Sequence, residues 1–235
     1  GTWKIEWQGP LEPGNIDCSL SLTFTPDSSI YHSDKHMSAG SYAKAMGEMN
    51  WSKEYFENLK SENQTRIEQG GRLEGTVTMG DQSEEVTLRG VRDHSWGKRN
   101  WNFIKRYIWN VLSFSDGIEL KGHLYRYLVY TTVNYGTSFR CLVSGWIGGD
   151  DSVIPIISAT DQALIGEDGV IPEEIRCRFT PKGCGPLDLT IYRNGLEHSW
   201  FMQNKTFEVC EAYCTFKVTD PADPDRVSGG FGMSE

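Results

Sequence analysis

Apolar and polar residues alternate along much of the chain, and glycine and proline interrupt the alternation at short intervals. Residues 3–7 and 18–24 alternate in this way, with Gly-Pro at positions 9–10 and Pro-Gly at positions 13–14 between them. A period of two residues places the apolar side chains on one face of a strand. The chain is therefore predicted to open with two β-strands.

The period changes between residues 38 and 60. Five apolar residues there recur at offsets of three, four or seven positions, which places them on one face of a helix: Tyr42, Met46, Met49, Phe56 and Leu59. Charged residues occupy the opposite face. The pattern predicts a single amphipathic helix near residues 41–60.

Short segments of strand composition fill the rest of the chain, at residues 64–69, 72–79, 84–91, 107–114, 118–125, 128–133, 139–147, 175–180, 187–192, 198–202 and 207–218. Turn signals at 80–82, 115–117, 134–136 and 194–195 predict hairpins, and 221–225 predicts a surface loop. Strands at such regular spacing predict an all-β fold with one or two antiparallel barrels. We place a boundary near Arg126, which gives halves at 1–125 and 126–235.

The composition and the net charge argue against several classes of partner. The chain has 235 residues, a mass of 26.6 kDa and a net charge of −9. This charge argues against nucleic acid and against an anionic membrane surface as partners. The longest apolar run, at residues 153–157, is far shorter than the roughly 20 residues of a membrane span. Eight tryptophans, ten tyrosines and ten phenylalanines instead favour an aromatic-lined interior.

The six cysteines are interpreted mainly as free, buried thiols. Cys210 and Cys214 lie on one predicted strand, where four steps separate their Cα atoms by about 13 Å, too far for a disulfide. Cys177 and Cys184 flank a turn and remain a candidate pair. No paired short spacings favour a metal site, so we expect no metal. The oligomeric state is left open.

The location of the protein in the cell is also left open. Glycosylation triplets at Asn50, Asn63 and Asn204 keep secretion open, and a chain that begins at Gly1 is consistent with a processed or excised piece. No P-loop, G-x-S-x-G or G-x-G-x-x-G element occurs, so nucleotide, serine-hydrolase and dinucleotide functions have no support.

The densest group of reactive side chains is Arg92-Asp93-His94-Ser95-Trp96-Gly97, followed by Arg99 and Trp101. Asp93 and His94 can give or take a proton near neutral pH, arginines supply charge partners, and tryptophans supply flat apolar walls. Such a set suits protonation of an alkene or enol in a dry pocket. The alternative is a structural knot of ion pairs that closes the end of a barrel.

This segment resembles the signature of a lipocalin-like family that includes carotenoid 1,2-hydratases, AttH-type proteins and fungal lipocalin-fold Diels-Alderases. The lead-in at 88–90 and the run Gln-Thr-Arg-Ile-Glu-Gln at 64–69 extend the resemblance. Residues 51–69 and 231–235 are similar to the barrel region of invertebrate proteins labelled phosphoenolpyruvate-synthase-like. Gly1-Thr2-Trp3 is similar to the G-x-W opening of lipocalins.

The resemblance implies a pair of lipocalin-like barrels that hold a hydrophobic small molecule, such as a terpenoid, polyene or pigment. It implies an acid–base set of Asp93, His94, Arg92 and Arg99, and ligand contacts from Trp96, Trp101, Gln64, Arg66, Glu68 and Trp3. An enzyme of this kind catalyses hydration, isomerisation or cyclisation without a cofactor. Two alternatives stay open: a carrier without turnover, and an accessory domain of a larger protein.

Overall fold

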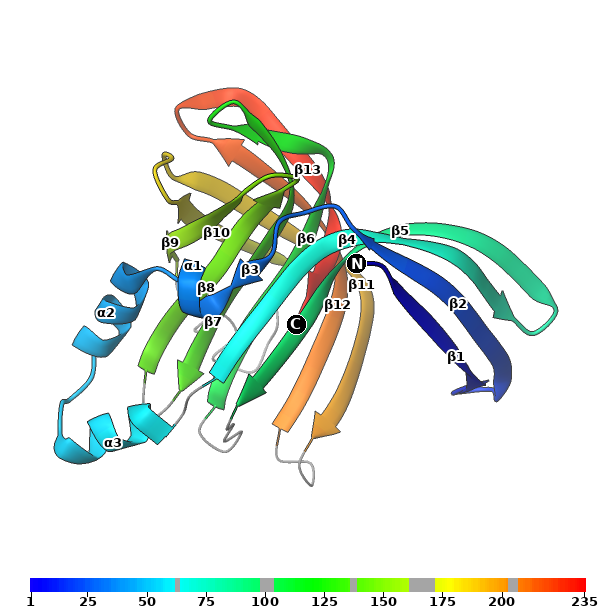
Figure 1. Ribbon diagram of the computed structural model, residues 1–235, viewed down its shortest axis with the longest axis horizontal. Coiled ribbons are helices and arrows are strands. Elements are labelled where there is room, and N and C mark those ends of the chain that lie inside the picture. The colour runs from blue at the N-terminus through cyan, green and yellow to red at the C-terminus, as the bar shows by residue number, and fades with distance from the viewer. Residues whose placement is uncertain (62–63, 98–103, 136–138, 161–171, 203–206) are drawn as a thin grey trace.

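The computed structural model describes residues 1–61, 64–97, 104–135, 139–160, 172–202 and 207–235 (Figure 1). Its N-terminal strands are β1 (Trp3–Leu11), β2 (Ile16–Pro26), β3 (Tyr31–His32), β4 (Gln64–Met79) and β5 (Gln82–Gly97). The helices are α1 (Ser33–His36), α2 (Ala39–Gly47) and α3 (Lys53–Ser61). The later strands are β6 (Ile104–Leu120), β7 (His123–Tyr135), β8 (Phe139–Gly149), β9 (Val153–Ala159), β10 (Glu174–Pro181), β11 (Leu187–Met202), β12 (Phe207–Asp220) and β13 (Asp223–Ser234).

Strands β6 to β13 form a closed barrel in which each strand pairs antiparallel with its neighbours in the chain. β13 closes the ring by pairing with β6, for example through Met233 opposite Val111. This arrangement confirms the predicted antiparallel, lipocalin-like all-β fold. It also removes every free strand edge from this part of the sheet.

Large apolar side chains fill the barrel. Leu112, Tyr130, Phe179 and Ile191 are essentially inaccessible to solvent and belong to one continuous core. An eight-stranded barrel has an interior that side chains can just fill. Because side chains alternate along β7, Tyr127 lies in a separate buried cluster on the outer wall. The barrel therefore has two apolar surfaces, one inside and one outside.

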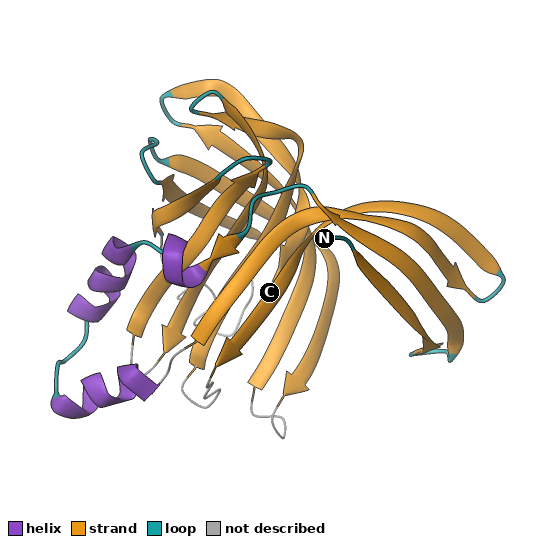
Figure 2. Ribbon diagram, viewed as in Figure 1, coloured by secondary structure: helices purple, strands orange, loops and turns teal. Residues whose placement is uncertain are grey.

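The N-terminal strands form a second sheet in the order β1-β2-β4-β3, with β5 paired along the whole of β4. One half of this sheet lies against the outer wall of the barrel, and the other half projects away from it as a wing (Figure 2). The outer-wall cluster joins the two parts, because Tyr31 of β3 and Val91 of β5 pack with barrel residues. The three helices lie beside the β8 and β9 side of the barrel (Figure 1).

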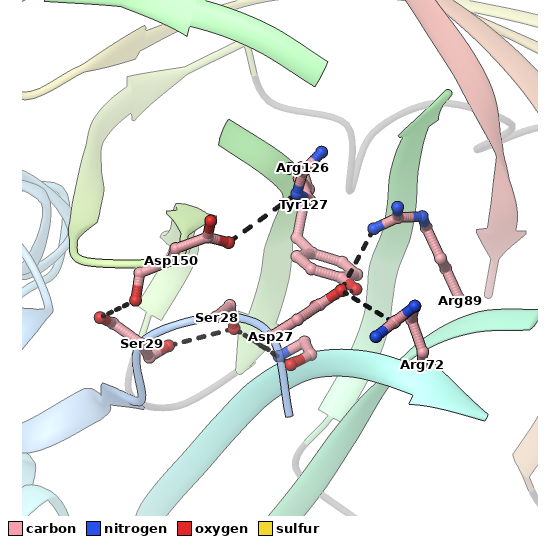
Figure 3. Close-up of polar contacts among 9 residues, drawn as sticks. Asp27, Ser28, Ser29, Arg72, Arg89, Arg126, Tyr127 and Asp150 are labelled. Carbon is pink, nitrogen blue, oxygen red and sulfur yellow. Dashed lines mark hydrogen bonds and ion pairs between the residues drawn. The ribbon is translucent and has the colours of Figure 1, made fainter. Parts of the chain in front are cut away.

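The sheet crosses the barrel most closely at Gly70 of β4. A Cβ atom at this position would lie 2.4 Å from the ring of Tyr127, so only glycine fits. The Tyr127 hydroxyl donates a hydrogen bond to Asp27, with 2.5 Å between the oxygens, and Arg89 lies 3.3 Å from the same carboxylate (Figure 3). Ser28 accepts a hydrogen bond from the Gly70 N–H at 2.8 Å. These contacts fix the sheet on the barrel.

The predicted helix near residues 41–60 is two helices, α2 and α3. The Trp51 indole donates a hydrogen bond to the carbonyl of Met46, and the Ser52 hydroxyl accepts one from the N–H of Tyr55. A serine that accepts in this way starts a new helix. The single-helix prediction is therefore corrected, although both helices lie in the predicted region.

Two predicted hairpin turns are bulges inside long strands. β6 runs through residues 115–117 with a shift of register between Ser113 and Ile118. Its turn comes later, at Lys121 and Gly122, whose φ values of 53° and 75° suit a two-residue hairpin. β11 likewise continues through residues 194–195. Glycine with a positive φ occurs in bulges as well as in turns. Only the pairing of the strand with its neighbour distinguishes a bulge from a turn.

The position of the last turn and the boundary between the two parts of the fold also differ from the predictions made from the sequence. Residues 223–225 of the expected surface loop belong to β13, and the turn is confined to 221–222. The expected boundary between residues 125 and 126 falls inside β7, whereas the barrel strands begin with β6. All six cysteines are free thiols, including Cys177 and Cys184.

We predict that Gly70→Ala lowers the free energy of unfolding by about 1–3 kcal/mol, because the new methyl group displaces the Tyr127 ring. Chemical denaturation of the two proteins measures the change. Gly47→Ala at the end of α2 is the matched control, since a Cβ there meets nothing within 4 Å. Equal effects of the two substitutions would contradict a steric requirement at Gly70.

Candidate functional site

A cavity of about 260 Å³ lies between the N-terminal sheet and the outer wall of the barrel. It is separate from the filled barrel interior. β4 and β5 form one side, and β6, β7 and β8 form the other. The lining residues are Ser33, Met37, Gln64, Thr65, Arg66, Asp93, Ser95, Ile104, Tyr107, Trp109, Thr131, Val133, Tyr135, Leu142, Ser144 and Glu235.

The register of β4 and β5 brings the polar residues together. Arg66 pairs with Ser95, and Glu68 pairs with Asp93. Directly paired residues of an antiparallel sheet project to the same face. All four side chains therefore share one face, which is also the face that Gly70 presents to the barrel two residues further along β4.

Arg66 lies at the centre of the charged residues of the cavity. Its Nη1 lies 3.4 Å from Glu68 Oε1, and its Nε lies 3.5 Å from Asp93 Oδ1. Its guanidinium also stacks on the ring of Trp109 at 5.4 Å from the centroid, a favourable cation–π geometry. One cation thus holds two carboxylates from neighbouring strands against the barrel.

Glu68 is 2% exposed and joins the sheet to the outer wall of the barrel. The Trp146 indole donates a hydrogen bond to its Oε2 at 2.6 Å. Tyr31 stacks on Trp146 and forms a hydrogen bond with Ser144. Burial of Tyr31 raises the pKa of its hydroxyl group to about 12. Burial raises the pKa of Glu68, while the Arg66 guanidinium and the Trp146 N–H oppose that rise. Glu68 lies behind the cavity wall and does not line it.

Glu235 is a site residue that the sequence analysis missed. Its backbone exchanges two hydrogen bonds with Trp109 of β6, each at 2.9 Å, and its side chain lines the cavity. Burial raises the pKa of its carboxyl group, with Arg66 lowering it and Asp93 raising it. The glycine-rich segment before it hides the strand pattern. Alternation of Val227, Phe231 and Met233 with small residues could have indicated a strand at 223–234, but its pairing with β6 is set by the tertiary structure.

The structure separates the motif residues into two groups. Asp93 lines the cavity, as do Gln64 and Arg66. Arg92 and His94 lie on the opposite face of β5, because side chains alternate along a strand. His94 contacts the ring of Trp96 edge-on at 5.2 Å.

The remaining predicted contacts also lie away from the cavity or outside the described residues. Trp3 of β1 lies beneath the guanidinium of Arg92, 4.6 Å from it, and is 51% exposed. Arg99 and Trp101 lie outside the described residues, as do Asn63 and Asn204 of the glycosylation triplets. The roles assigned to all these residues stay predictions.

The chemistry of the site follows from its charges. Among the described residues, the carboxyl groups of Glu68 and Asp93 pair with the guanidinium of Arg66, and Glu235 lines the same cavity. Burial disfavours the ionised form of a carboxyl group, and it raises the pKa of both Glu68 and Glu235. The group is thus suited to retain a proton and to exchange it with a molecule in the cavity. The lining also includes apolar side chains, among them Ile104, Val133 and Leu142.

Among the described residues, no group of three or more His, Cys, Asp or Glu side chains is arranged to hold a metal ion. None of the helices in the described part of the chain has the length and apolarity needed to cross a membrane.

Comparisons with known proteins place the chain in a family and a fold. The family model named Domain of unknown function (DUF7064) matches residues 1–235. No curated protein matches the sequence. The crystal structure of kievitone hydratase from Nectria haematococca is similar, with a TM-score of 0.54 and 12% identity over 97% of this chain and 63% of that enzyme. The chain thus spans under two thirds of the enzyme, and the likeness concerns the fold.

We predict that Glu68→Gln changes how stability depends on pH. The folded chain holds the Glu68 proton more tightly than the unfolded chain does, because burial raises the folded-state pKa above its usual 4.5. This contribution to stability is complete below pH 4.5 and is lost as the pH rises through the raised value. As the pH rises through the raised pKa, the free energy of unfolding of the wild type should therefore fall relative to that of Glu68→Gln.

Urea denaturation at a series of pH values measures the difference. Glu119→Gln, at an exposed position of β6, controls for the loss of one negative charge. A constant difference between the wild type and Glu68→Gln across the series would show that Glu68 does not titrate as inferred.

Proposed function

The chain belongs to the DUF7064 family, and we propose that this member binds a small, largely apolar molecule in the cavity between its two sheets and exchanges a proton with it. The observation that carries the proposal is the cavity itself. Its lining combines the charged Arg66, Asp93 and Glu235 with apolar side chains such as Val133 and Leu142. A site with a few convergent polar groups on an apolar wall is typical of ligand pockets.

The size of the cavity limits the ligand. A volume of 260 Å³ lies just below the usual range of about 300–1,000 Å³ for pockets that enclose drug-sized molecules. A compact terpenoid or a phenolic molecule fits such a space, whereas a long polyene would project into solvent. A second cavity of about 250 Å³, beside α2 and lined by Lys44, Glu48 and Arg140, lacks the acid–base cluster that favours the cavity at Asp93.

The polar cluster favours acid–base chemistry without a cofactor. In a hydration, a carboxyl group gives its proton to one carbon of a C=C bond, and the π electrons form the new C–H bond. A water oxygen then bonds to the neighbouring carbon, and its surplus proton returns to the carboxylate. Asp93 lines the cavity and is the candidate donor, while Arg66 positions it at 3.5 Å.

Hydration is the first reaction to examine among hydration, isomerisation and cyclisation, because a kievitone hydratase has a similar fold. Binding without turnover is the second candidate function. The observation that favours it is the pair of contacts that Arg66 makes with Trp109 and Glu68 makes with Trp146, which would serve to fix the two sheets together.

We predict that Asp93→Asn abolishes hydration and His94→Ala spares it, because the two neighbours on β5 lie on opposite faces. Incubation with kievitone in ¹⁸O-labelled water, followed by mass spectrometry, measures uptake of one labelled oxygen. Thermal melting verifies that both variants fold. If His94→Ala alone lost the uptake of labelled oxygen, the reaction would be shown to occur on the other face of the sheet.

A second prediction concerns binding alone. Val133→Trp fills part of the cavity, so a small molecule that the wild type retains through purification should be lost. Solvent extraction and mass spectrometry of the two proteins measure the retained molecule. Val227→Trp, at an exposed position of β13, is the control and should retain it. Equal retention by Val133→Trp would place the ligand elsewhere.

A further inference from the structure

The second cavity, of about 250 Å³, lies where α2 covers the barrel wall at β8 and β9 (Figure 1). We call it the α2 cavity. No residue lines both this cavity and the cavity at Asp93, so the two sites are distinct. The lining residues are Ser41, Lys44 and Glu48 from α2 and its C-terminal end, Arg140, Cys141 and Val143 from β8, and Ile157, Ser158 and Ala159 from β9.

The pairing of the strands makes room for the α2 cavity. In the described residues β8 and β9 pair at three positions, the last of which sets Trp146 opposite Pro155, and β9 then continues along β10. The later part of β9 is covered by α2. The Ser41 hydroxyl of this helix donates a hydrogen bond to the carbonyl of Ile157, with 2.8 Å between the oxygens. The helix therefore closes the space that β8 and β9 leave where they no longer pair.

The floor of the α2 cavity is apolar. Val143 belongs to the barrel core, and Cys141 and Ala159 pack against that core. Because side chains alternate along β8, Leu142 between them lies on the other face and lines the cavity at Asp93. β8 thus separates the two cavities. An alkyl or aryl group in the α2 cavity would contact the apolar core of the barrel.

The rim of the α2 cavity is charged. Lys44, Arg140 and Glu48 are exposed to solvent, and none of them forms an ion pair with another described residue. Two cations and one anion leave a net positive charge at the rim, in a chain whose net charge is −9. A single carboxylate would balance this charge. A doubly charged anion would exceed it and would be repelled by Glu48.

We propose that the α2 cavity binds a small monocarboxylate that carries an alkyl or aryl group. Arg140 offers paired N–H donors that match the two oxygens of a carboxylate, and Lys44 adds a second positive charge. The apolar group rests on the floor, where its removal from water adds to the affinity. This second binding site is independent of the acid–base chemistry proposed at Asp93, because the two cavities share no residue.

Calorimetric titration with butanoate, hexanoate and octanoate tests the proposal near neutral pH, where a carboxylic acid is ionised. The affinity should rise about fourfold for each added methylene group until the floor is filled. Octanol has the same chain as octanoate without the charge, and it should bind roughly tenfold more weakly or less tightly still. Inorganic phosphate, which lacks the apolar group, should not compete with octanoate.

Charge-removing variants locate the carboxylate. Lys44→Gln and Arg140→Gln should each weaken octanoate binding about tenfold. Lys35→Gln is the matched control for the loss of one positive charge, because Lys35 is exposed on α1 and lines neither cavity. It should bind octanoate as the wild type does. All three substitutions replace exposed side chains, and circular dichroism verifies that the variants fold.

Alkylation of Cys141 gives a second, independent readout. Iodoacetamide forms an S–C bond with the thiol and releases iodide and a proton, and mass spectrometry of the peptides measures the extent at each cysteine. At ten times its dissociation constant, octanoate should slow alkylation of Cys141 about tenfold. Cys184 is also partly exposed but lines neither cavity, so its rate should not change.

Four outcomes would overturn the proposal. Absence of binding by all three carboxylates at millimolar concentration would show that the site is not used in this way. Octanol that binds as tightly as octanoate would exclude a role for the cations, and phosphate that binds as tightly would indicate a general anion site. Wild-type affinity in both Lys44→Gln and Arg140→Gln, with no protection of Cys141, would place the carboxylate elsewhere.

Discussion

The close crossing of β4 over the barrel wall at Gly70 is the constraint on which the rest of the structure depends. The absence of a side chain there lets the β4 backbone approach the Tyr127 ring, and the Tyr127 hydroxyl is then held by Asp27. Arg66 and Glu68 lie two and four residues before Gly70 on the same face. Their approach to β6 and β8 is therefore set by this crossing, and so is the width of the cavity.

Burial and charge then act together at the charged residues of the cavity. Glu68 is fixed between the Arg66 guanidinium and the Trp146 indole, so its carboxyl group stays in place behind the wall. Glu68 and Asp93 both pair with Arg66, and burial raises the pKa of both Glu68 and Glu235. The hydrogen bond from Trp146 to Glu68 and the stacking of Arg66 on Trp109 hold the sheet on the barrel, so the structural and functional interpretations of this cluster are compatible.

The two faces of the N-terminal sheet have different surroundings. Near the barrel, the face that carries Glu68 and Asp93 meets the outer wall. On the wing, the opposite face buries Phe24 and Leu22 but leaves Trp7 and Leu88 44% and 50% exposed. Because side chains alternate, a single six-residue motif contributes to both faces, with Asp93 on one side and Arg92 and His94 on the other.

The all-β class, the hairpin at Gly80 and Asp81, and the segment around Asp93 as the place to look for chemistry were predictable from the amino-acid sequence, because period-two alternation and turn residues are local properties. The bulges at Gly117 and Gly195, the position of Glu235 in the site, and the location of the cavity outside the barrel emerged only in the folded structure. Each of these depends on which strand lies across from which, and hydrogen-bond partners distant in sequence set that pairing.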